Sequence, residues 1–432
     1  MHFHNSALAR LVPEGNYRAA DLKRIAAALD EHQTLTFARL PSGLYSASSA
    51  GESITGTGYA NVWVRDNIYV AFAHDVTGAT PVAIEVVRGL TSFFSRYRHR
   101  FDDIISCAVN PQDVANRPHV RFDGLALAEI GDERWAHAQN DALGYFLWLS
   151  STVAASGAMR PDTDSVSVLT RLVRYLQAIC FWQDEDSGHW EEQRKISASS
   201  IGAVVAGLEA FAALMRRSRE WRQECGPDSE SLAASLAERG RQALNGILPA
   251  ECVQSAGSKN RRYDAALLFL LFPLNVIDAP DIATLVLHDI SKYLAGEHGV
   301  RRYLGDSYFA PDYETRLSEV DRTRDFSEDL AARDTLLSKI GDEAQWCLFD
   351  PILSAYFGRR YLATRSVADR DRQVFHFNRS LAQITTDWRC AELYYLRRGE
   401  YVANPHVPLQ WTQANLLVAM HALRATIASD GR

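Results

Sequence analysis

The sequence predicts an all-α protein with two layers of helices. Apolar residues recur at helical spacing along most of the 432 residues, and strand alternation is scarce. Two kinds of helical segment are present. Residues 201–214 are small and apolar nearly all round, so this helix should be buried on most sides, whereas residues 229–248 carry charge on one face. Alternation of buried and amphipathic helices indicates two concentric layers.

About a dozen helices are expected from the intervals of three and four between apolar residues. In chain order they lie near residues 20–32, 66–78, 82–98, 141–156, 163–182, 199–216, 229–248, 264–272, 281–295, 343–362, 366–386 and 412–428. No Ser/Gly/Pro-rich linker divides the chain, so we expect one domain over residues 1–432. The polar stretch at 311–333 is expected to be a lid or an insertion, or more simply a solvated loop or an exposed helix.

Composition excludes several classes of protein. The net charge is −7 without a basic block, which argues against nucleic acid as a partner. The six cysteines include no CxxC pair, so the common zinc and redox spacings are missing and no disulfide framework is indicated. The N-terminus lacks the apolar core of a signal peptide, and no stretch marks a membrane helix. We therefore expect a cytoplasmic protein that needs no metal and no cofactor; the oligomeric state stays open.

Five clusters of charged residues beside large aromatic rings are spread along the chain. They lie at 63–67 (WVRDN), 135–141 (WAHAQND), 190–192 (WEE), 302–306 (RYLGD) and 390–394 (CAELY). Their first or central residues recur at intervals of 70, 56, 111 and 90, as expected if successive helical hairpins each send one loop to the same end. Aromatic rings stack on the C–H faces of sugars, and charged groups bind the hydroxyls. Two separated glutamates also suit acid/base hydrolysis of a glycosidic bond.

These stretches resemble glycoside hydrolase family 15, the glucoamylase family, and most of all the branch that includes the glucoamylase-like domain of phosphorylase kinase regulatory subunits. The matching segments are VWVRDNIY at 62–69, RWAHAQNDALGYFL at 134–147, GHWEE at 188–192 with ISASSIGAVVAGLEA at 196–210, RRYLGDSY at 301–308, and CAELYYL at 390–396 with NPHVPLQWTQANLL at 404–417. They occur in the family's order. The resemblance implies an (α/α)6 barrel, which agrees with the two-layer pattern.

The resemblance also implies catalytic roles. Glu191 matches the general acid and Glu392 the general base of an inverting mechanism, with Glu400 as a competing candidate for the base. Glu192 would supply a neighbouring charge or hold a sugar hydroxyl. Many glucoamylases carry an aspartate two residues before the tryptophan of this motif, where the present chain has Gly188.

Substrate contacts follow from the same resemblance. Arg65 and Asp66 match a clamp on the terminal sugar, because a guanidinium fork and a carboxylate can bind adjacent hydroxyls. Arg302 matches a second arginine that Asp306 would orient, with the adjacent Arg301 as the alternative.

The remaining expected site residues form walls and supports. They are Trp135 as the stacking platform, Trp63 and Trp411 as further aromatic walls, and Asp141 as a supporting residue. His137, His189 and His406 lie near the motifs, but their spacing indicates no metal geometry, so they are expected to be hydrogen-bonded neighbours.

The resemblance thus implies an exo-acting, inverting α-glucoside hydrolase that releases β-glucose from short α-gluco-oligosaccharides. The alternative is a non-catalytic, glucoside-binding regulatory module. A lyase or phosphorylase on the same fold is a third possibility, although such lyases usually rely on Tyr/His pairs rather than two glutamates, and no phosphate site is evident for a phosphorylase. The sequence does not choose between α-1,4, α-1,6 and trehalose-type linkages.

Overall fold

The computed structural model describes residues 1–49, 57–131, 135–316, 318 and 340–431. Of the polar stretch expected to form a lid, 311–316 and 318 fall inside these ranges, and the rest of 311–333 lies outside the described residues. The short helix α13 (Tyr313–Arg316) lies within the described part of that stretch.

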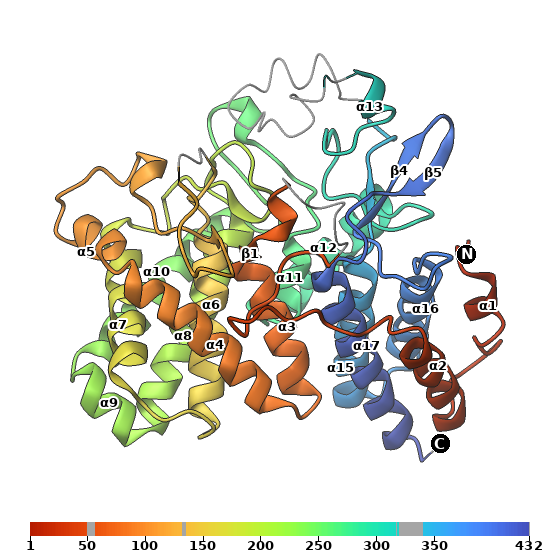
Figure 1. The fold of residues 1–432 in the computed structure, drawn as a ribbon, viewed down its shortest axis with the longest axis horizontal. Coiled ribbons are helices and arrows are strands. Elements are labelled where there is room, and N and C mark those ends of the chain that lie inside the picture. Colours follow the sequence, from red (N-terminus) through yellow and green to blue (C-terminus); the bar gives the residue numbers. More distant parts are fainter. Residues whose placement is uncertain (50–56, 132–134, 317, 319–339, 432) are drawn as a thin grey trace.

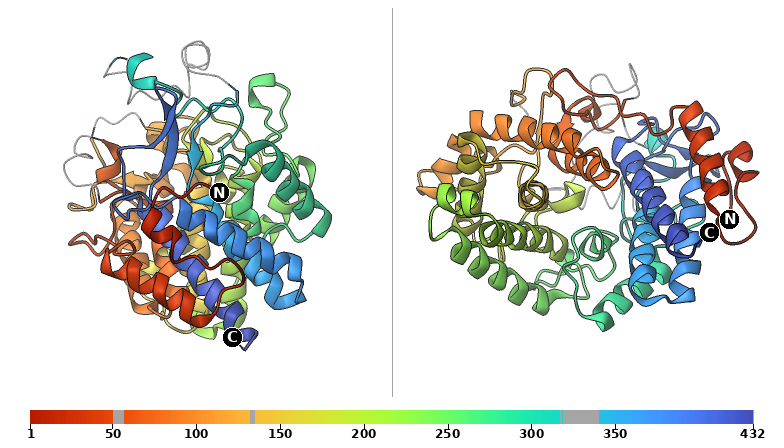
Figure 2. Two further views of the ribbon diagram at one scale, coloured as in Figure 1. Left: turned by 90° about the vertical axis from the view of Figure 1, so that its right-hand side faces the viewer. Right: turned by 90° about the horizontal axis from the view of Figure 1, so that it is seen from below.

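Twelve helices of the described chain alternate between an outer and an inner layer (Figures 1 and 2). The outer helices are α2 (Ala19–Glu31), α4 (Thr80–Arg96), α7 (Thr163–Ala178), α10 (Ser229–Ile247), α12 (Pro280–Asp289) with the π-helical turn η6 (Ile290–Leu294), and α16 (Val367–Ala382). The inner helices are α3 (Val64–Val76), α6 (Asn140–Ala155), α8 (Ala198–Arg217), α11 (Leu267–Leu271), α15 (Phe349–Thr364) and α17 (Gln410–Ser429). This arrangement is the (α/α)6 barrel, so the predicted fold class is confirmed.

The inner layer is a closed ring. Each inner helix contacts the next in chain order, and α17 contacts α3 to complete the circle, which is visible from below in Figure 2. Inner helices are therefore covered by the ring on two sides and by an outer helix on a third. This explains why α8 is apolar nearly all round: it is long and apolar enough to cross a membrane, but 83% of its most apolar window is buried inside the barrel.

Close approach of α6 and α8 requires glycine. A Cβ on Gly144 would lie 2.5 Å from the backbone carbon of Ala203, and one on Gly207 would lie 2.7 Å from the carbonyl oxygen of Gly144. Both contacts are with backbone atoms, which cannot turn aside. The two glycines therefore set the distance between these neighbouring inner helices.

Short strands gather at one end of the barrel. β1 (Val62–Trp63) pairs with β2 (Arg121–Phe122), and β3 (Gln345–Trp346), β4 (Leu393–Arg397) and β5 (Glu400–Ala403) form an antiparallel sheet at the upper end in Figure 1. An outer helix separates successive inner helices, so the inner helices run in one direction. Their N-termini and the preceding loops meet at this end, as the motif intervals predicted.

Most predicted helix boundaries hold within a few residues, with three main differences. The helix predicted over 343–362 begins later, at Phe349, because Gln345 and Trp346 pair with β4. Only Leu267–Leu271 of the segment 264–272 is α-helical. Three short helices were not predicted: α1 (Ser6–Ala9), α5 (His99–Ile105) and α9 (Arg219–Cys225). Each has at most seven residues, too few for apolar periodicity to show.

Candidate active site

The predicted site residues lie together at the end of the barrel where the inner helices begin. Arg65 and Asp66 are in the first turn of α3, Asp141 is in the first turn of α6, and Trp411 begins α17. Glu191 precedes α8, and Glu392 directly precedes β4. The positive ends of the helix dipoles therefore face a cluster rich in carboxylates.

Glu191 follows a one-turn 3₁₀ helix, η4 (Gly188–Trp190), and takes up the left-handed conformation at φ 50° and ψ 44°. Its side chain is 15% exposed, and Oε1 accepts a hydrogen bond from Arg65 Nη2. Burial raises the pKa of Glu191 to about 7, although Arg65 acts in the opposite direction. A carboxyl of this kind can hold a proton near neutral pH, as a general acid must.

Arg65 connects Glu191 to the barrel wall. Its guanidinium is 3% exposed, and Nη1 donates to Asp141 Oδ2 at 2.7 Å and to Gln139 Oε1 at 3.2 Å. Within the described residues its Nε has no partner. The predicted supporting position of Asp141 therefore agrees with the geometry.

Asp66 is the carboxyl group with the least protein contact in the cluster. It is buried, but no side chain of the described residues donates a hydrogen bond to it, and burial raises its pKa to about 6. A buried carboxylate with a backbone donor but no side-chain donor is costly unless a ligand supplies further donors. Sugar hydroxyls would do so.

Glu392 is held by two donors that sequence reasoning missed. Tyr59 donates its phenolic hydrogen toward Oε1 and Oε2 at 2.8 and 3.0 Å, and Asn404 Nδ2 donates to Oε2. Tyr59 Oη also lies 2.5 Å from Tyr308 Oη. Burial raises the pKa of Glu392 to about 7, and both donors oppose this rise because they stabilise the charged form. The rival, Glu400, is exposed on β5 opposite Arg397.

Arg302 lies close enough to both glutamates to lower the pKa of each. The carboxylate of Asp306 accepts one hydrogen bond from Arg302 Nε and one from Arg302 Nη2, each at 2.7 Å. This pair of hydrogen bonds fixes the plane of the guanidinium. The rings of Trp346, Tyr308 and Trp190 lie 4.7, 5.0 and 5.1 Å from its Cζ.

Arg301 is turned away from the site. Its guanidinium donates to the carbonyls of Ala295 and Gly341 and lies 3.1 Å from a carboxylate oxygen of Glu343. Of the two adjacent arginines, therefore, only Arg302 faces the glutamates.

Glu192 was expected to supply a neighbouring charge or to hold a sugar hydroxyl. In the structure its carboxylate is bound by protein side chains. Its carboxylate accepts from Lys195 Nζ at 2.7 Å, from Tyr303 Oη at 2.5 Å and from Arg261 Nη1. With three donors from the protein already bound, this buried carboxylate is a poor ligand for a sugar hydroxyl. The sequence neighbours of Glu192 gave no sign of Arg261, which lies 69 residues further along the chain.

The three predicted tryptophans occupy different environments. Trp63 and Trp135 are half-buried, and their rings meet edge to face at 5.4 Å, with Arg121 over the Trp135 ring at 3.5 Å. Trp411 is 4% exposed and stacks on Phe269 beneath Arg65. Trp63 and Trp135 are therefore partly exposed rings that contact each other and Arg121, whereas Trp411 is packed under Arg65.

The three histidines near the motifs are packed against protein groups. His137 stacks on His119, His189 lies 3.0 Å from Tyr145 Oη, and His406 stacks on Tyr59. In the described part of the chain, no three His, Cys, Asp or Glu side chains have a geometry that could hold a metal ion.

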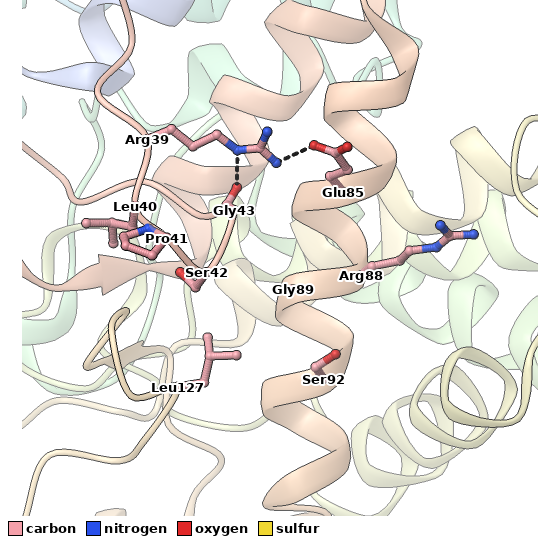
Figure 3. Close-up of a pocket in the computed structure, with 10 residues that line it drawn as sticks. All are labelled: Arg39, Leu40, Pro41, Ser42, Gly43, Glu85, Arg88, Gly89, Ser92 and Leu127. Atoms are coloured by element: carbon pink, nitrogen blue, oxygen red, sulfur yellow. Dashed lines mark hydrogen bonds and ion pairs between the residues drawn. The ribbon is translucent and has the colours of Figure 1, made fainter.

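A separate hollow lies on the outside of the barrel, between the loop at 39–43 and α4 (Figure 3). Its volume is about 480 Å³. Arg39 donates to the carbonyl of Gly43 at 2.9 Å and pairs with Glu85 across it. The described lining contains neither an aromatic ring nor a pair of carboxylates. This hollow therefore lacks the groups that sugar chemistry needs. It is lined by Arg39, Leu40, Pro41, Ser42, Gly43, Glu85, Arg88, Gly89, Ser92 and Leu127.

Comparison with known sequences identifies the family of this fold and site. The sequence model of the glycosyl hydrolases family 15 matches residues 31–329, more than half of the chain. The chain belongs to glycosyl hydrolase family 15. This match covers Arg65, Glu191 and Arg302 and ends before Glu392.

Curated relatives of this chain include regulatory subunits of phosphorylase b kinase. The mouse (Mus musculus) phosphorylase b kinase regulatory subunit alpha, skeletal muscle isoform, is 26% identical over 277 residues, 58% of this chain and 21% of that protein. The chain thus spans about a fifth of the length of the curated relatives it matches.

Solved structures of glycosidases share the fold of this family 15 chain. A wild-type glycosidase superposes with a TM-score of 0.67 at 20% identity, covering 95% of this chain and 99% of its own. A bacterial glucoamylase complexed with acarbose gives a TM-score of 0.57 at 16% identity, covering 89% of this chain and 53% of its own. At these identities the likeness shows the fold, and the chemistry has to be argued from the side chains.

Proposed function

We propose that this family 15 protein is an exo-acting, inverting α-glucoside hydrolase that releases β-glucose from short α-gluco-oligosaccharides. The observation that carries the proposal is a pair of glutamates in unlike surroundings, of which Glu392 is buried and Glu191 is partly buried. Glu191 contacts one arginine, whereas Glu392 is held by a phenol and an amide, and burial raises the pKa of each to about 7. Two such carboxyls, one protonated and one ionised, are what acid/base hydrolysis requires.

In the proposed mechanism the two glutamates act on opposite faces of one sugar ring. Glu191 protonates the glycosidic oxygen as the bond to the anomeric carbon breaks. Glu392 takes a proton from a water molecule that attacks the same carbon from the other side, which inverts its configuration. Arg302 lies near both groups, where its charge favours the ionised form of each carboxyl. No cofactor takes part in these steps.

Two groups beside the glutamates support the exo-acting specificity. No side chain of the described residues donates a hydrogen bond to the carboxylate of Asp66, and the Nε of Arg65 has no partner within those residues. Adjacent donors and acceptors of this kind suit the hydroxyls of a terminal glucose. Trp135 supplies a half-buried aromatic face for stacking. A variant of one structurally similar glycosidase has been solved in complex with glucose.

The six cysteines are free, which supports placing the enzyme in a reducing compartment such as the cytoplasm. We leave the linkage preference among α-1,4, α-1,6 and trehalose-type glucosides to experiment.

A panel of α-linked gluco-oligosaccharides tests the proposal, with the wild type and Glu191→Gln assayed side by side and the product anomer followed by NMR. We expect the wild type to release β-glucose and Glu191→Gln to lose about 10²–10⁴-fold in rate. A loss below about tenfold, or release of α-glucose, would contradict the proposal.

The second function is a regulatory module that binds glucosides without turnover. The similarity to phosphorylase b kinase regulatory subunits favours it. Binding of the oligosaccharides by calorimetry, with no glucose released from any of them, would support this function instead.

A further inference from the structure

Arg261 contacts two carboxylates next to the turn that carries Glu191. One belongs to Glu192, and the other belongs to Asp264, which binds Trp190. Arg261 Nη1 donates to Glu192, the residue that follows Glu191. The same Nη1 lies 2.9 Å from Asp264 Oδ2, and Asp264 Oδ1 accepts from Trp190 Nε1, also at 2.9 Å. One guanidinium therefore links the residue before Glu191 to the residue after it.

The backbone between these two anchors needs such a constraint. Glu191 has φ 50°, in the left-handed region, where a residue with a Cβ loses roughly 1–2 kcal/mol relative to the right-handed one. Relaxation of this residue would swing its carboxyl away from Arg65. The contact with Arg65 is the only hydrogen bond of that carboxyl within the described residues, so the anchors at Trp190 and Glu192 must oppose the relaxation.

Charge balance shows why an arginine is needed at this position. Burial and the nearby Asp264 raise the pKa of Glu251 well above its usual range, and burial raises the pKa of Asp264 although Arg261 lowers it. Arg261 contacts the carboxylates of both Glu192 and Asp264, and Lys195 is the second cation beside Glu192. Loss of Arg261 would leave two buried carboxylates with one cation, which is strongly unfavourable.

We propose that Arg261 is a positioning residue for the general acid: it holds the turn at residues 190–192 so that the carboxyl of Glu191 points at the glycosidic oxygen. The inference rests on the proposed function of Glu191. Arg261 touches neither Glu191 nor Glu392. Its ring contact, with Tyr303 at 3.4 Å from Cζ, and the backbone pairing of Arg261 with Cys252 fix its own place.

A comparison of leaving groups separates this role from a general loss of structure. Fluoride leaves without a proton, so α-glucosyl fluoride depends on the base much more than on the acid. An oligosaccharide needs both. We expect Arg261→Met to lower kcat on maltotriose or isomaltotriose, whichever the wild type prefers, by about 10²-fold, the cost of a misplaced catalytic group. On α-glucosyl fluoride the loss should stay below about threefold, because the base is untouched.

Two further variants complete the design. Arg261→Lys keeps the charge but loses the planar fork. Its kcat on the oligosaccharide should therefore lie between that of Arg261→Met and that of the wild type. Arg262→Met is the matched control, because the neighbouring Arg262 pairs with Asp289 instead and is 41% exposed. We expect Arg262→Met to behave as the wild type on both substrates.

Equal losses on both substrates, or no loss on either, would overturn the inference while leaving the hydrolase proposal intact. Failure of the wild type to hydrolyse any oligosaccharide would instead contradict the proposed function.

A crystal structure of Arg261→Met, or of Arg261→Lys if the first variant does not fold, tests the geometry without any assay. Glu191 should leave the left-handed region and lose its contact with Arg65. An unchanged turn at 190–192 would overturn the inference.

Discussion

The phenolic hydroxyl of Tyr59 lies within hydrogen-bond distance of both carboxylate oxygens of Glu392, at 2.8 and 3.0 Å. These residues are 333 positions apart in the chain. A donor placed between the two oxygens stabilises the ionised carboxylate and fixes its plane. Both effects serve a general base.

Tyr59→Phe should therefore lower the fraction of Glu392 that is ionised at neutral pH. Removal of a hydrogen bond to a charged group costs about 1.5–3 kcal/mol, so we expect kcat/KM at neutral pH to fall by about tenfold or more. The pKa of Glu392 should rise, which moves the acid limb of the pH profile to higher pH. Tyr308→Phe is the control, because the Tyr308 hydroxyl contacts Tyr59 and not Glu392. An acid limb that moves equally in both variants would contradict this prediction.

The choice between two glutamates as base can be tested by matched substitutions. Glu392→Gln should lower kcat by about 10²-fold or more, since the water would lose its proton acceptor. Glu400→Gln should leave kcat within about twofold of the wild type, because Glu400 is exposed on β5. Steady-state kinetics on the preferred oligosaccharide decide between them. The reverse ranking would assign the base to Glu400.

The pH dependence of kcat/KM should be a narrow bell. Hydrolysis needs Glu191 protonated and Glu392 ionised, and burial raises the pKa of each to about 7. The rate should thus fall on both sides of about pH 7. Initial rates measured in steps across both limbs test this, and a broad plateau would contradict it.

Stability should depend on pH through the same two groups. Their folded-state pKa values lie above those of a glutamate in an unfolded chain, so the folded protein binds the two protons more tightly. This contribution to the free energy of unfolding is fully present below about pH 4.3 and is lost as pH rises through about 7. Urea unfolding at intervals across this window should show the decline. In a Glu191→Gln/Glu392→Gln double variant, the decline in the free energy of unfolding with pH should be smaller. An identical decline in the wild type and the double variant would contradict this prediction.

Packing between α6 and α8 should not tolerate a methyl group at Gly144. The added Cβ would lie 2.5 Å from the Ala203 backbone, so Gly144→Ala should lower the free energy of unfolding by about 1–3 kcal/mol. Gly246→Ala is the control, because Gly246 lies in the helix α10 with open space around it. That variant should gain about 0.5–1 kcal/mol. Chemical denaturation of both variants provides the measurement.

Sequence reasoning could predict the parts of this molecule that local patterns determine. Helical periodicity identified both layers, and the motif intervals placed Arg65, Glu191 and Arg302 on loops that meet at one end of the barrel. The choice of Arg302 over Arg301 was left open, because adjacent residues can face either way until the preceding turn is known.

Other features depend on contacts between distant segments. Tyr59 and Asn404 carry no local signal that they will meet at Glu392. Glu192 looked free beside Glu191, but its surroundings are set by Arg261 and Tyr303 from later parts of the chain. Trp411 was predicted to line the site and is packed under Arg65, because α17 closes against α3.

Closure of the inner ring by α17 against α3 has a consequence for biosynthesis. The segment that carries Arg65 and Asp66 leaves the ribosome more than three hundred residues before α17. Until α17 is made, α3 has an uncovered apolar flank, and Glu392 and Asn404 emerge only shortly before that helix. The nascent chain therefore cannot bring Glu191, Glu392 and the Arg65–Asp66 pair together one after another. The site forms only once α17 has been synthesised, and a chain that stops before α17 should be a client of chaperones.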